Sequence, residues 1–101
     1  MENGLSNPIS VNSKEHLSIG GCDCVELAKQ FGTPLYVMDE NTIRNTCRVY
    51  KSAMDKYYNG KGLVLYASKA FCSTAMCRIA DQEGMGLDVV SGGELYTALK
   101  A

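Results

Sequence analysis

The second half of the chain alternates between apolar runs with the period of a strand and apolar runs with the period of a helix, and this order constrains the fold most. Residues 62–70 (GLVLYASKA) and 87–91 (LDVVS) form strand-like runs, whereas residues 73–83 repeat apolar side chains at helical spacing. Ser91 opens a last helical stretch. Strand, helix, strand and helix in this order predict an α/β fold, in which a right-handed crossover joins two parallel strands.

Two parallel strands cannot be covered on both faces by a chain of this length. Parallel sheets are buried on both sides, and the sequence ends within its last helical stretch, without a capping residue. We therefore expect the chain to be the N-terminal piece of a longer α/β protein, and the domain to be incomplete.

Two more helices are predicted in the first sixty residues. Asp23 precedes a helical pattern over residues 24–31, and Glu26 follows it by three residues, as in a capping box. Asp39 precedes a longer helical pattern over residues 40–57. Around these helices we expect a loose leader over residues 1–15, a short edge strand over residues 16–21 and a strand over residues 34–39.

The charge and the apolar content of the chain argue against several classes of partner. Ten Lys and Arg residues against eleven Asp and Glu residues give a net charge of −1, so no basic field favours nucleic acid or an anionic membrane. The N-terminus lacks the basic and apolar blocks of a signal peptide, and no apolar stretch approaches the ~20 residues that a membrane span needs. We expect a cytoplasmic protein that binds neither nucleic acid nor membrane.

The five cysteines do not follow a metal-binding pattern. Their spacings include C-x-C at residues 22–24 and C-x4-C at residues 72–77 but no C-x2-C pair, and His16 has no partner at zinc-finger spacing. An odd count without a secretory signal also disfavours disulfides. We expect small buried thiols and no metal site.

Lys69 stands near the end of the apolar run at residues 62–70, where a lysine is unusual. Strand alternation predicts that Ala67 and Lys69 share one face and that Lys69 lies at the C-terminal end of its strand. Asp88 lies on the next strand, so the two side chains are expected to approach each other at the edge where α/β proteins hold their chemistry. One interpretation is a functional amine, and the other is a lysine that extends from a strand end to solvent.

Three segments of the sequence resemble one known family in order and spacing. They are GTPLYVMDENTIRNTCRVYKSAM, YASKAFC and GLDVVSGGELYTALKA, and the similarity extends from about Ile19 to Ala101. The chain resembles the start of the diaminopimelate decarboxylases, a branch of the fold-type III pyridoxal-phosphate family that also includes alanine racemase and the ornithine and arginine decarboxylases. The frame Ala-Ser-Lys-Ala-Phe favours the diaminopimelate branch.

This resemblance implies a (β/α)8 TIM-type barrel followed by a β-sandwich domain, working as a homodimer. Residues 1–38 would associate with the β-sandwich, and residues 39–101 would supply the first β/α units of the barrel. Lys69 would bind pyridoxal 5'-phosphate as an imine, with Ala67 and Asp88 also at the cofactor and with Lys69 and Asp88 as catalytic residues. The implied reaction is the decarboxylation of meso-2,6-diaminopimelate to L-lysine and CO2, the last step of lysine biosynthesis.

Two acidic residues keep alternative roles at the level of the sequence. Asp88 is either a counter-charge for the cofactor-bound or free lysine, or a buried acid that is bonded to neighbouring backbone. Glu94 lies in the family's Ser-Gly-Gly-Glu segment, but it also completes a capping box with Ser91, and we favour the cap.

Two other functions also stay open. One is a different fold-type III amino-acid decarboxylase or a racemase, which would share the fold and the lysine. The other is a catalytically inactive homologue that regulates a partner, although the intact frame around Lys69 argues against it. We expect the isolated 101 residues to show no decarboxylase activity, because they supply only part of the barrel.

Overall fold

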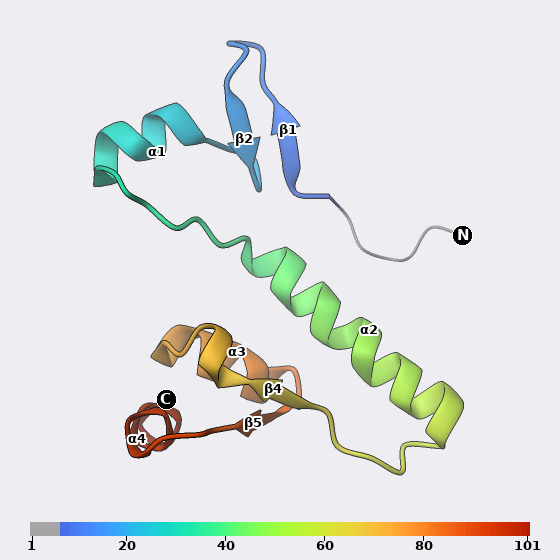
Figure 1. Ribbon diagram of the computed structural model, residues 1–101. Coiled ribbons are helices and arrows are strands. Elements are labelled where there is room, and N and C mark those ends of the chain that lie inside the picture. The colour runs from blue at the N-terminus through green and yellow to red at the C-terminus, as the bar shows by residue number, and fades with distance from the viewer. Residues whose placement is uncertain (1–6) are drawn as a thin grey trace. The chain divides into compact units, whose positions relative to one another are not determined.

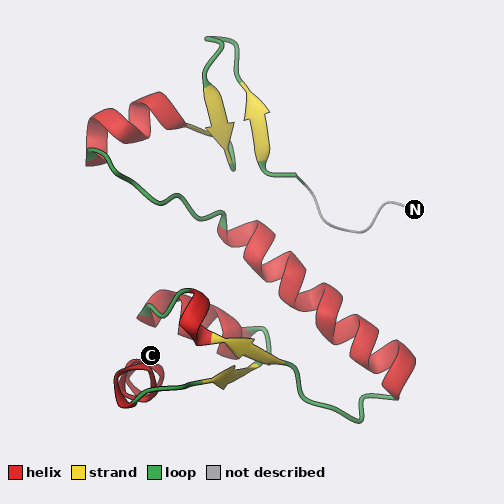
Figure 2. Ribbon diagram, in the orientation of Figure 1, coloured by secondary structure: helices red, strands yellow, loops and turns green. Residues whose placement is uncertain are grey.

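The structure is a computed structural model that describes residues 7–101 of the chain. Two compact units, Met1–Asn45 and Thr46–Ala101, are described separately. Figure 1 follows the helices and strands in chain order, and Figure 2 shows that helices, strands and loops all occur in the mixed α/β chain. None of the helices in the described part of the chain is long and apolar enough to cross a membrane.

The first unit begins with a small antiparallel sheet. Its strands are β1 (Ile9–Val11), β2 (Leu17–Ile19) and β3 (Cys22–Asp23), in the order β1-β2-β3. The predicted leader is therefore wrong for residues 9–11, which form β1, and its first six residues lie outside the described part. The edge strand predicted at residues 16–21 is present as β2, but it lies in the middle of the sheet. Residues 9–11 pair with one side of it and β3 pairs with the other, so both sides of β2 form backbone hydrogen bonds.

A two-glycine turn joins β2 to β3. Gly20 and Gly21 have φ angles of 57° and 82°, the left-handed region that glycine adopts without strain. A Cβ atom on Gly20 would also collide with the carboxylate of Asp39. The turn thus requires glycine at residue 20 for two separate reasons.

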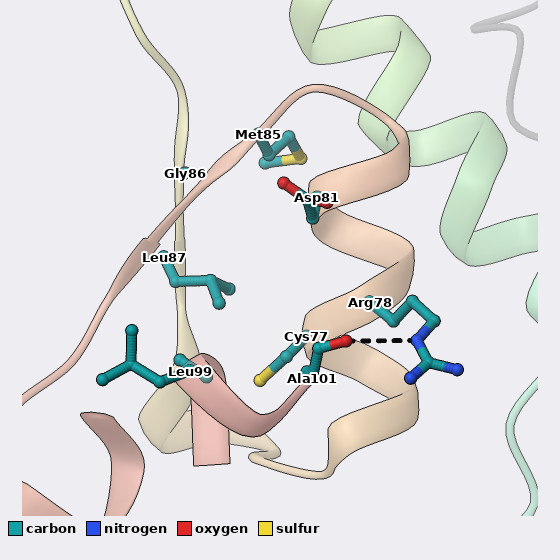
Figure 3. A pocket seen from close by; sticks show the side chains of 9 residues that line it. Cys77, Arg78, Asp81, Met85, Gly86, Leu87, Leu99 and Ala101 are labelled. Atoms are coloured by element: carbon teal, nitrogen blue, oxygen red, sulfur yellow. Dashed lines mark hydrogen bonds between the residues drawn. The ribbon is translucent and has the colours of Figure 1, made fainter. Parts of the chain in front are cut away.

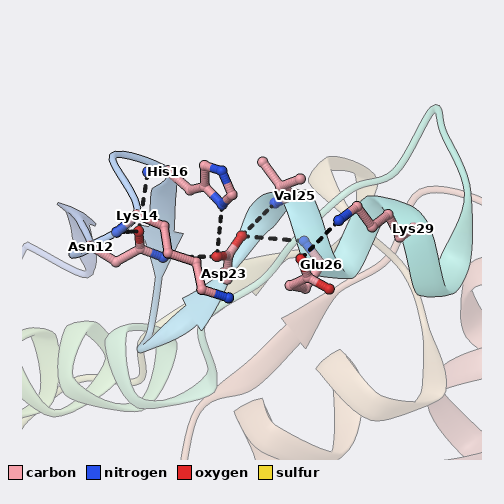
Figure 4. Close-up of polar contacts among 7 residues, drawn as sticks. All are labelled: Asn12, Lys14, His16, Asp23, Val25, Glu26 and Lys29. Atoms are coloured by element: carbon pink, nitrogen blue, oxygen red, sulfur yellow. Dashed lines mark hydrogen bonds and ion pairs between the residues drawn. The ribbon is translucent and has the colours of Figure 1, made fainter.

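Helix α1 (Cys24–Phe31) begins where the sequence predicts it. The Asp23 carboxylate accepts hydrogen bonds from the backbone N–H groups of Val25 and Glu26, at 2.9 and 3.2 Å (Figure 4). Glu26 does not complete the expected capping box, because its side chain is paired with Lys29 at 3.0 Å. The helix ends at Gly32, whose N–H donates to the carbonyl of Ala28.

Helix α2 (Glu40–Tyr58) is the longest helix and confirms the second predicted helix to within one residue. Asp39 caps it by accepting hydrogen bonds from the backbone and the hydroxyl of Thr42, at 2.8 and 2.6 Å, and these bonds lower the pKa of Asp39. The strand predicted at residues 34–39 is wrong. A strand needs a neighbour that takes its backbone hydrogen bonds, and residues 34–39 pair with none of the described strands.

The second unit contains the predicted strand, helix, strand and helix. They are β4 (Leu65–Ala67), α3 (Thr74–Gln82), β5 (Gly86–Asp88) and α4 (Gly92–Lys100). Strands β4 and β5 pair in parallel, with Ala67 opposite Asp88 at their C-terminal ends. The parallel βαβα unit is therefore confirmed, and α3 is its crossover helix.

The core of the second unit lies along one face of α3. Met76, Cys77 and Ala80 are buried there. The helical spacing of the sequence predicts an inner face of Ala75, Met76, Ile79 and Ala80, but Ala75 is exposed, Ile79 is only partly buried, and Cys77 is buried instead. The helix is rotated slightly from the predicted orientation, so that the small Cys77 thiol is packed in the interior.

The crossover helix ends in a motif that needs a glycine. The N–H of Gly84 donates to the carbonyl of Asp81, and the N–H of Met85 donates to the carbonyl of Ala80, which together form a Schellman motif. Gly84 has a φ angle of 74°. The reversal of direction leads the chain from α3 directly into β5.

Candidate functional site

Lys69 lies in a single turn of 3-10 helix, η1 (Ser68–Ala70), that follows β4 directly. The strand predicted over residues 62–70 is therefore too long, since it is regular only from Leu65 to Ala67. Strand alternation stops at Ala67, so it does not place Lys69 on the face of Ala67. The position at the C-terminal end of the parallel strands is as expected, and the lysine side chain is exposed.

The turn around Lys69 is held by three hydrogen bonds. The Ser68 hydroxyl donates to the carbonyl of Asp88 at 2.8 Å, and the N–H of Phe71 donates to the carbonyl of Ser68 at 3.1 Å. The hydroxyl of Tyr66 donates to the carbonyl of Phe71, also at 3.1 Å. Burial raises the pKa of Tyr66 above its usual value, so this phenol keeps its proton for the bond near neutral pH.

Asp88 ends β5 and lies opposite Ala67 in the parallel register. The structure therefore brings Ala67, Lys69 and Asp88 to one end of the two-stranded sheet, as the sequence predicts. Asp88 is exposed among the described residues. No hydrogen bond or ion pair joins its carboxylate to Lys69 within the described residues.

Glu94 and Ser91 cap the start of α4 as the sequence predicts, in a variant of the capping box in which Glu94 reaches the N–H of Val90, one residue before the cap. The Ser91 hydroxyl accepts a hydrogen bond from the Glu94 N–H at 3.1 Å. The Glu94 carboxylate in turn accepts hydrogen bonds from the N–H of Val90 at 2.8 Å and the hydroxyl of Ser91 at 3.2 Å. This reciprocal arrangement satisfies backbone donors at the helix start.

The amine of Lys69 has the chemistry that an aldehyde cofactor requires. Its side chain takes no part in a hydrogen bond or an ion pair with the described residues. Lys29 is paired with Glu26, and Lys56 and Lys100 lie over tyrosine rings at 5.0 and 5.5 Å. Other lysines in the described part of the chain are unpaired as well, but none of them lies in the turn that follows a parallel strand. A primary amine that no carboxylate holds, at the C-terminal end of parallel strands, fits the role of a cofactor anchor.

A separate cavity lies elsewhere in the second unit. Its volume is about 350 Å³, and it is lined by the second half of α3, the start of β5 and the end of α4 (Figure 3). Arg78 spans one side and donates a hydrogen bond to the carbonyl of Ala101 at 3.3 Å. None of Ala67, Lys69 and Asp88 lines this cavity, so it is separate from the candidate site.

None of the five cysteines forms a disulfide in the structure, and Cys47 and Cys77 are buried. Burial raises the pKa of the Cys77 thiol, which keeps it protonated and poorly nucleophilic. No group of three or more His, Cys, Asp and Glu side chains in residues 7–101 could hold a metal ion.

Sequence reasoning did not identify Ser68 and Tyr66 as parts of the site. Ser68 is completely buried, and its hydroxyl joins the turn of Lys69 to the end of β5. The signal was present, because Ser68 is a polar residue within a run that is otherwise apolar as far as Lys69. A buried hydroxyl needs a partner, so its presence there indicated a specific hydrogen bond.

Taken together, a parallel βαβα unit and an unpaired lysine in the turn after its first strand define an α/β protein with an accessible amine at the C-terminal end of its parallel strands. Residues 40–101 match the family model of the pyridoxal-dependent decarboxylases, which describes their pyridoxal binding domain. The chain belongs to this family.

Several curated relatives are diaminopimelate decarboxylases. The chain is 56% identical over 91 residues to the diaminopimelate decarboxylase of Bacillus methanolicus, an alignment that covers 90% of this chain and 21% of the relative. It is 52% identical over 90 residues to the diaminopimelate decarboxylase of Bacillus subtilis, covering 89% of this chain and 20% of that one. The chain thus spans about a fifth of the length of these relatives.

Solved structures show the same similarity. A crystal structure of the diaminopimelate decarboxylase of Methanocaldococcus jannaschii in complex with L-lysine superposes with a TM-score of 0.82 at 38% identity. The superposition covers 99% of this chain and 23% of that one. A protein of Aquifex aeolicus matches with the same TM-score at 35% identity, over 96% of this chain and 23% of its own.

Proposed function

We propose that this chain is the N-terminal, lysine-bearing part of a diaminopimelate decarboxylase, which converts meso-2,6-diaminopimelate to L-lysine and CO2. The observation that carries the proposal is the position of Lys69, an unpaired amine in the turn at the C-terminal end of β4. The substrate is supported by the shared name of the relatives and by the L-lysine bound to the archaeal structure.

Lys69 anchors the cofactor in this proposal. Its Nζ would hold pyridoxal 5'-phosphate covalently through the aldehyde carbon of the cofactor. The bound cofactor supplies an electron sink for the electron pair that remains when CO2 departs. Ala67 leaves room beside the anchor because its side chain is a single methyl group, and Asp88 offsets the positive charge of the lysine from the neighbouring strand end.

The proposal extends to the whole protein. We infer a (β/α)8 barrel followed by a β-sandwich, a homodimer, and a cytoplasmic location. Residues 1–38 associate with the β-sandwich and residues 39–101 begin the barrel. The start of α2 at Glu40 supports a boundary there, whereas the two compact units divide a little later, inside α2.

Covalent labelling tests the anchor. The whole encoded protein is incubated with pyridoxal phosphate, reduced with borohydride and mapped by peptide mass spectrometry. The pyridoxyl group is expected on Lys69. Lys69→Ala is expected to lose the label and the decarboxylation, whereas Lys61→Ala, a control in the loop before β4, keeps both. A label on another lysine, or normal turnover by Lys69→Ala, would contradict the proposal.

The substrate is tested by offering the same protein several amino acids. meso-2,6-Diaminopimelate is expected to release CO2, whereas ornithine and arginine are expected to release little. Conversion of L-alanine to D-alanine would instead indicate a racemase. A protein that takes the label on Lys69 but turns over none of these substrates would support the inactive, regulatory homologue.

A further inference from the structure

Ser68 precedes Lys69 in the chain and has no exposed surface. Its hydroxyl donates a hydrogen bond of 2.8 Å to the carbonyl of Asp88, the last residue of β5. This bond connects the first residue of η1 to the neighbouring strand at the level where the candidate site begins. No described polar side-chain atom is buried without a partner, so this bond also satisfies the hydroxyl.

We propose that Ser68 is a positioning residue, whose hydrogen bond to β5 fixes the turn that carries Lys69 and so sets where the lysine amine meets its cofactor. The inference rests on the proposed function of Lys69 as the anchor. It adds a role for a residue that does not itself touch the cofactor.

The physical reason lies in the backbone of the turn. The Lys69 side chain is exposed and forms no hydrogen bond or ion pair with the described residues, so only the backbone of η1 fixes the position of its Cα atom. If that backbone moves, the region that the lysine amine can reach moves with it. Misplacement of a reacting group by about 1 Å can cost roughly a hundredfold in rate. An alanine at position 68 would keep the buried Cβ atom, but it would not bond to Asp88.

A second bond holds the other end of the same turn. The Tyr66 hydroxyl reaches over η1 to the carbonyl of Phe71, which directly follows the turn. The Phe71 N–H bonds back to the carbonyl of Ser68. The backbone on both sides of Lys69 is thus attached to fixed elements, while its side chain stays free.

Two serine variants of the whole encoded protein separate positioning from general stability. Ser68→Ala removes the bond beside Lys69. Ser73→Ala is the control, because the Ser73 hydroxyl also takes part in a single hydrogen bond, which it accepts from the Met76 N–H at 3.1 Å at the start of α3. The rate of borohydride-trapped pyridoxal phosphate capture by Lys69 is measured at equal concentrations, and thermal denaturation is followed in parallel.

We expect Ser68→Ala to slow capture by about 10- to 100-fold, and Ser73→Ala to capture at the unsubstituted rate despite a lower melting temperature. Equal capture rates in the two variants would overturn the positioning role. Failure of the unsubstituted protein to capture the cofactor at Lys69 would overturn the proposed function as well, so the two failures are distinguishable.

A third variant keeps the inference falsifiable if Ser68→Ala does not fold. Tyr66→Phe removes the bond to Phe71 without changing a fully buried side chain. We expect slower capture by Lys69 together with faster hydrogen exchange of the Phe71 amide. An unchanged capture rate in a folded Tyr66→Phe variant would show that the attachment of the turn does not position the lysine.

Discussion

The carboxylate of Asp23 links the N-terminal sheet to helix α1. One of its oxygens accepts hydrogen bonds from His16 Nδ1 and Asn12 Nδ2, each at 2.9 Å, and the other caps the helix (Figure 4). The bond from His16 is the largest cause that holds the pKa of Asp23 well below its usual value, and desolvation opposes it. The ionised carboxylate is therefore preferred in the folded state.

This preference makes the N-terminal unit sensitive to acid. The stabilisation by Asp23 is fully present above the usual pKa of 3.8 and is lost as the pH falls below that value toward the lowered pKa of the folded state. His16→Ala is expected to raise the pKa of Asp23 more than Asn12→Ala, as measured by NMR titration of the carboxyl carbon. Equal shifts in the two variants would contradict the leading role of His16.

At the scale of elements, the capping box of α4 gives Glu94 a structural role. Glu94→Gln keeps an acceptor for the Val90 N–H and the Ser91 hydroxyl, so helix stability and turnover are expected to change little. Glu94→Ala removes the acceptor and is expected to cost about 1 kcal/mol of folding free energy. Urea denaturation and turnover of the whole encoded protein check this. A large loss of turnover in a stable Glu94→Gln variant would indicate a chemical role instead.

The elements that the sequence predicted correctly are those determined by neighbouring residues. The caps at Asp23, Asp39 and Ser91 act over three residues, so α1, α2 and α4 begin where local patterns place them. The alternation of strands and helices likewise gave the parallel βαβα unit. The position of Lys69 and Asp88 at one end of the sheet followed from that unit alone.

The errors concern contacts that a local pattern does not contain. Residues 34–39 have the composition of a strand, but no described strand pairs with them. The short turn around Lys69 depends on the bond from Ser68 to Asp88, residues 20 positions apart. The sequence-based prediction therefore extended the alternation of side chains along β4 past Ala67. In the structure the chain instead enters the turn at Ser68.

At the scale of the whole molecule, apolar side chains remain exposed in the 101-residue chain. Leu63 and Leu65, before and at the start of β4, are 67% and 52% exposed, and Leu99 on α4 is 79% exposed. A complete barrel takes about 250 residues. The two parallel strands and the helices beside them lack the surfaces that bury such side chains in a full α/β domain.

We therefore predict that the isolated 101 residues have no decarboxylase activity and no sharp cooperative thermal transition. Aggregation or binding of a hydrophobic dye is expected instead, because apolar surface and strand edges are uncovered. Differential scanning calorimetry and size-exclusion chromatography are the measurements. A monomer with a single sharp melting transition would show that the chain is a complete folding unit.

The hydrogen bond between Ser68 and Asp88 also bears on the order in which the molecule forms. It closes a loop of only 20 residues, most of which belong to the crossover helix and its links. The entropic cost of closing a loop rises with its length, by about 0.6 kcal/mol for each doubling. Contacts this local favour rapid folding. The turn that carries Lys69 can consequently take shape during synthesis, before any distant part of the polypeptide has left the ribosome.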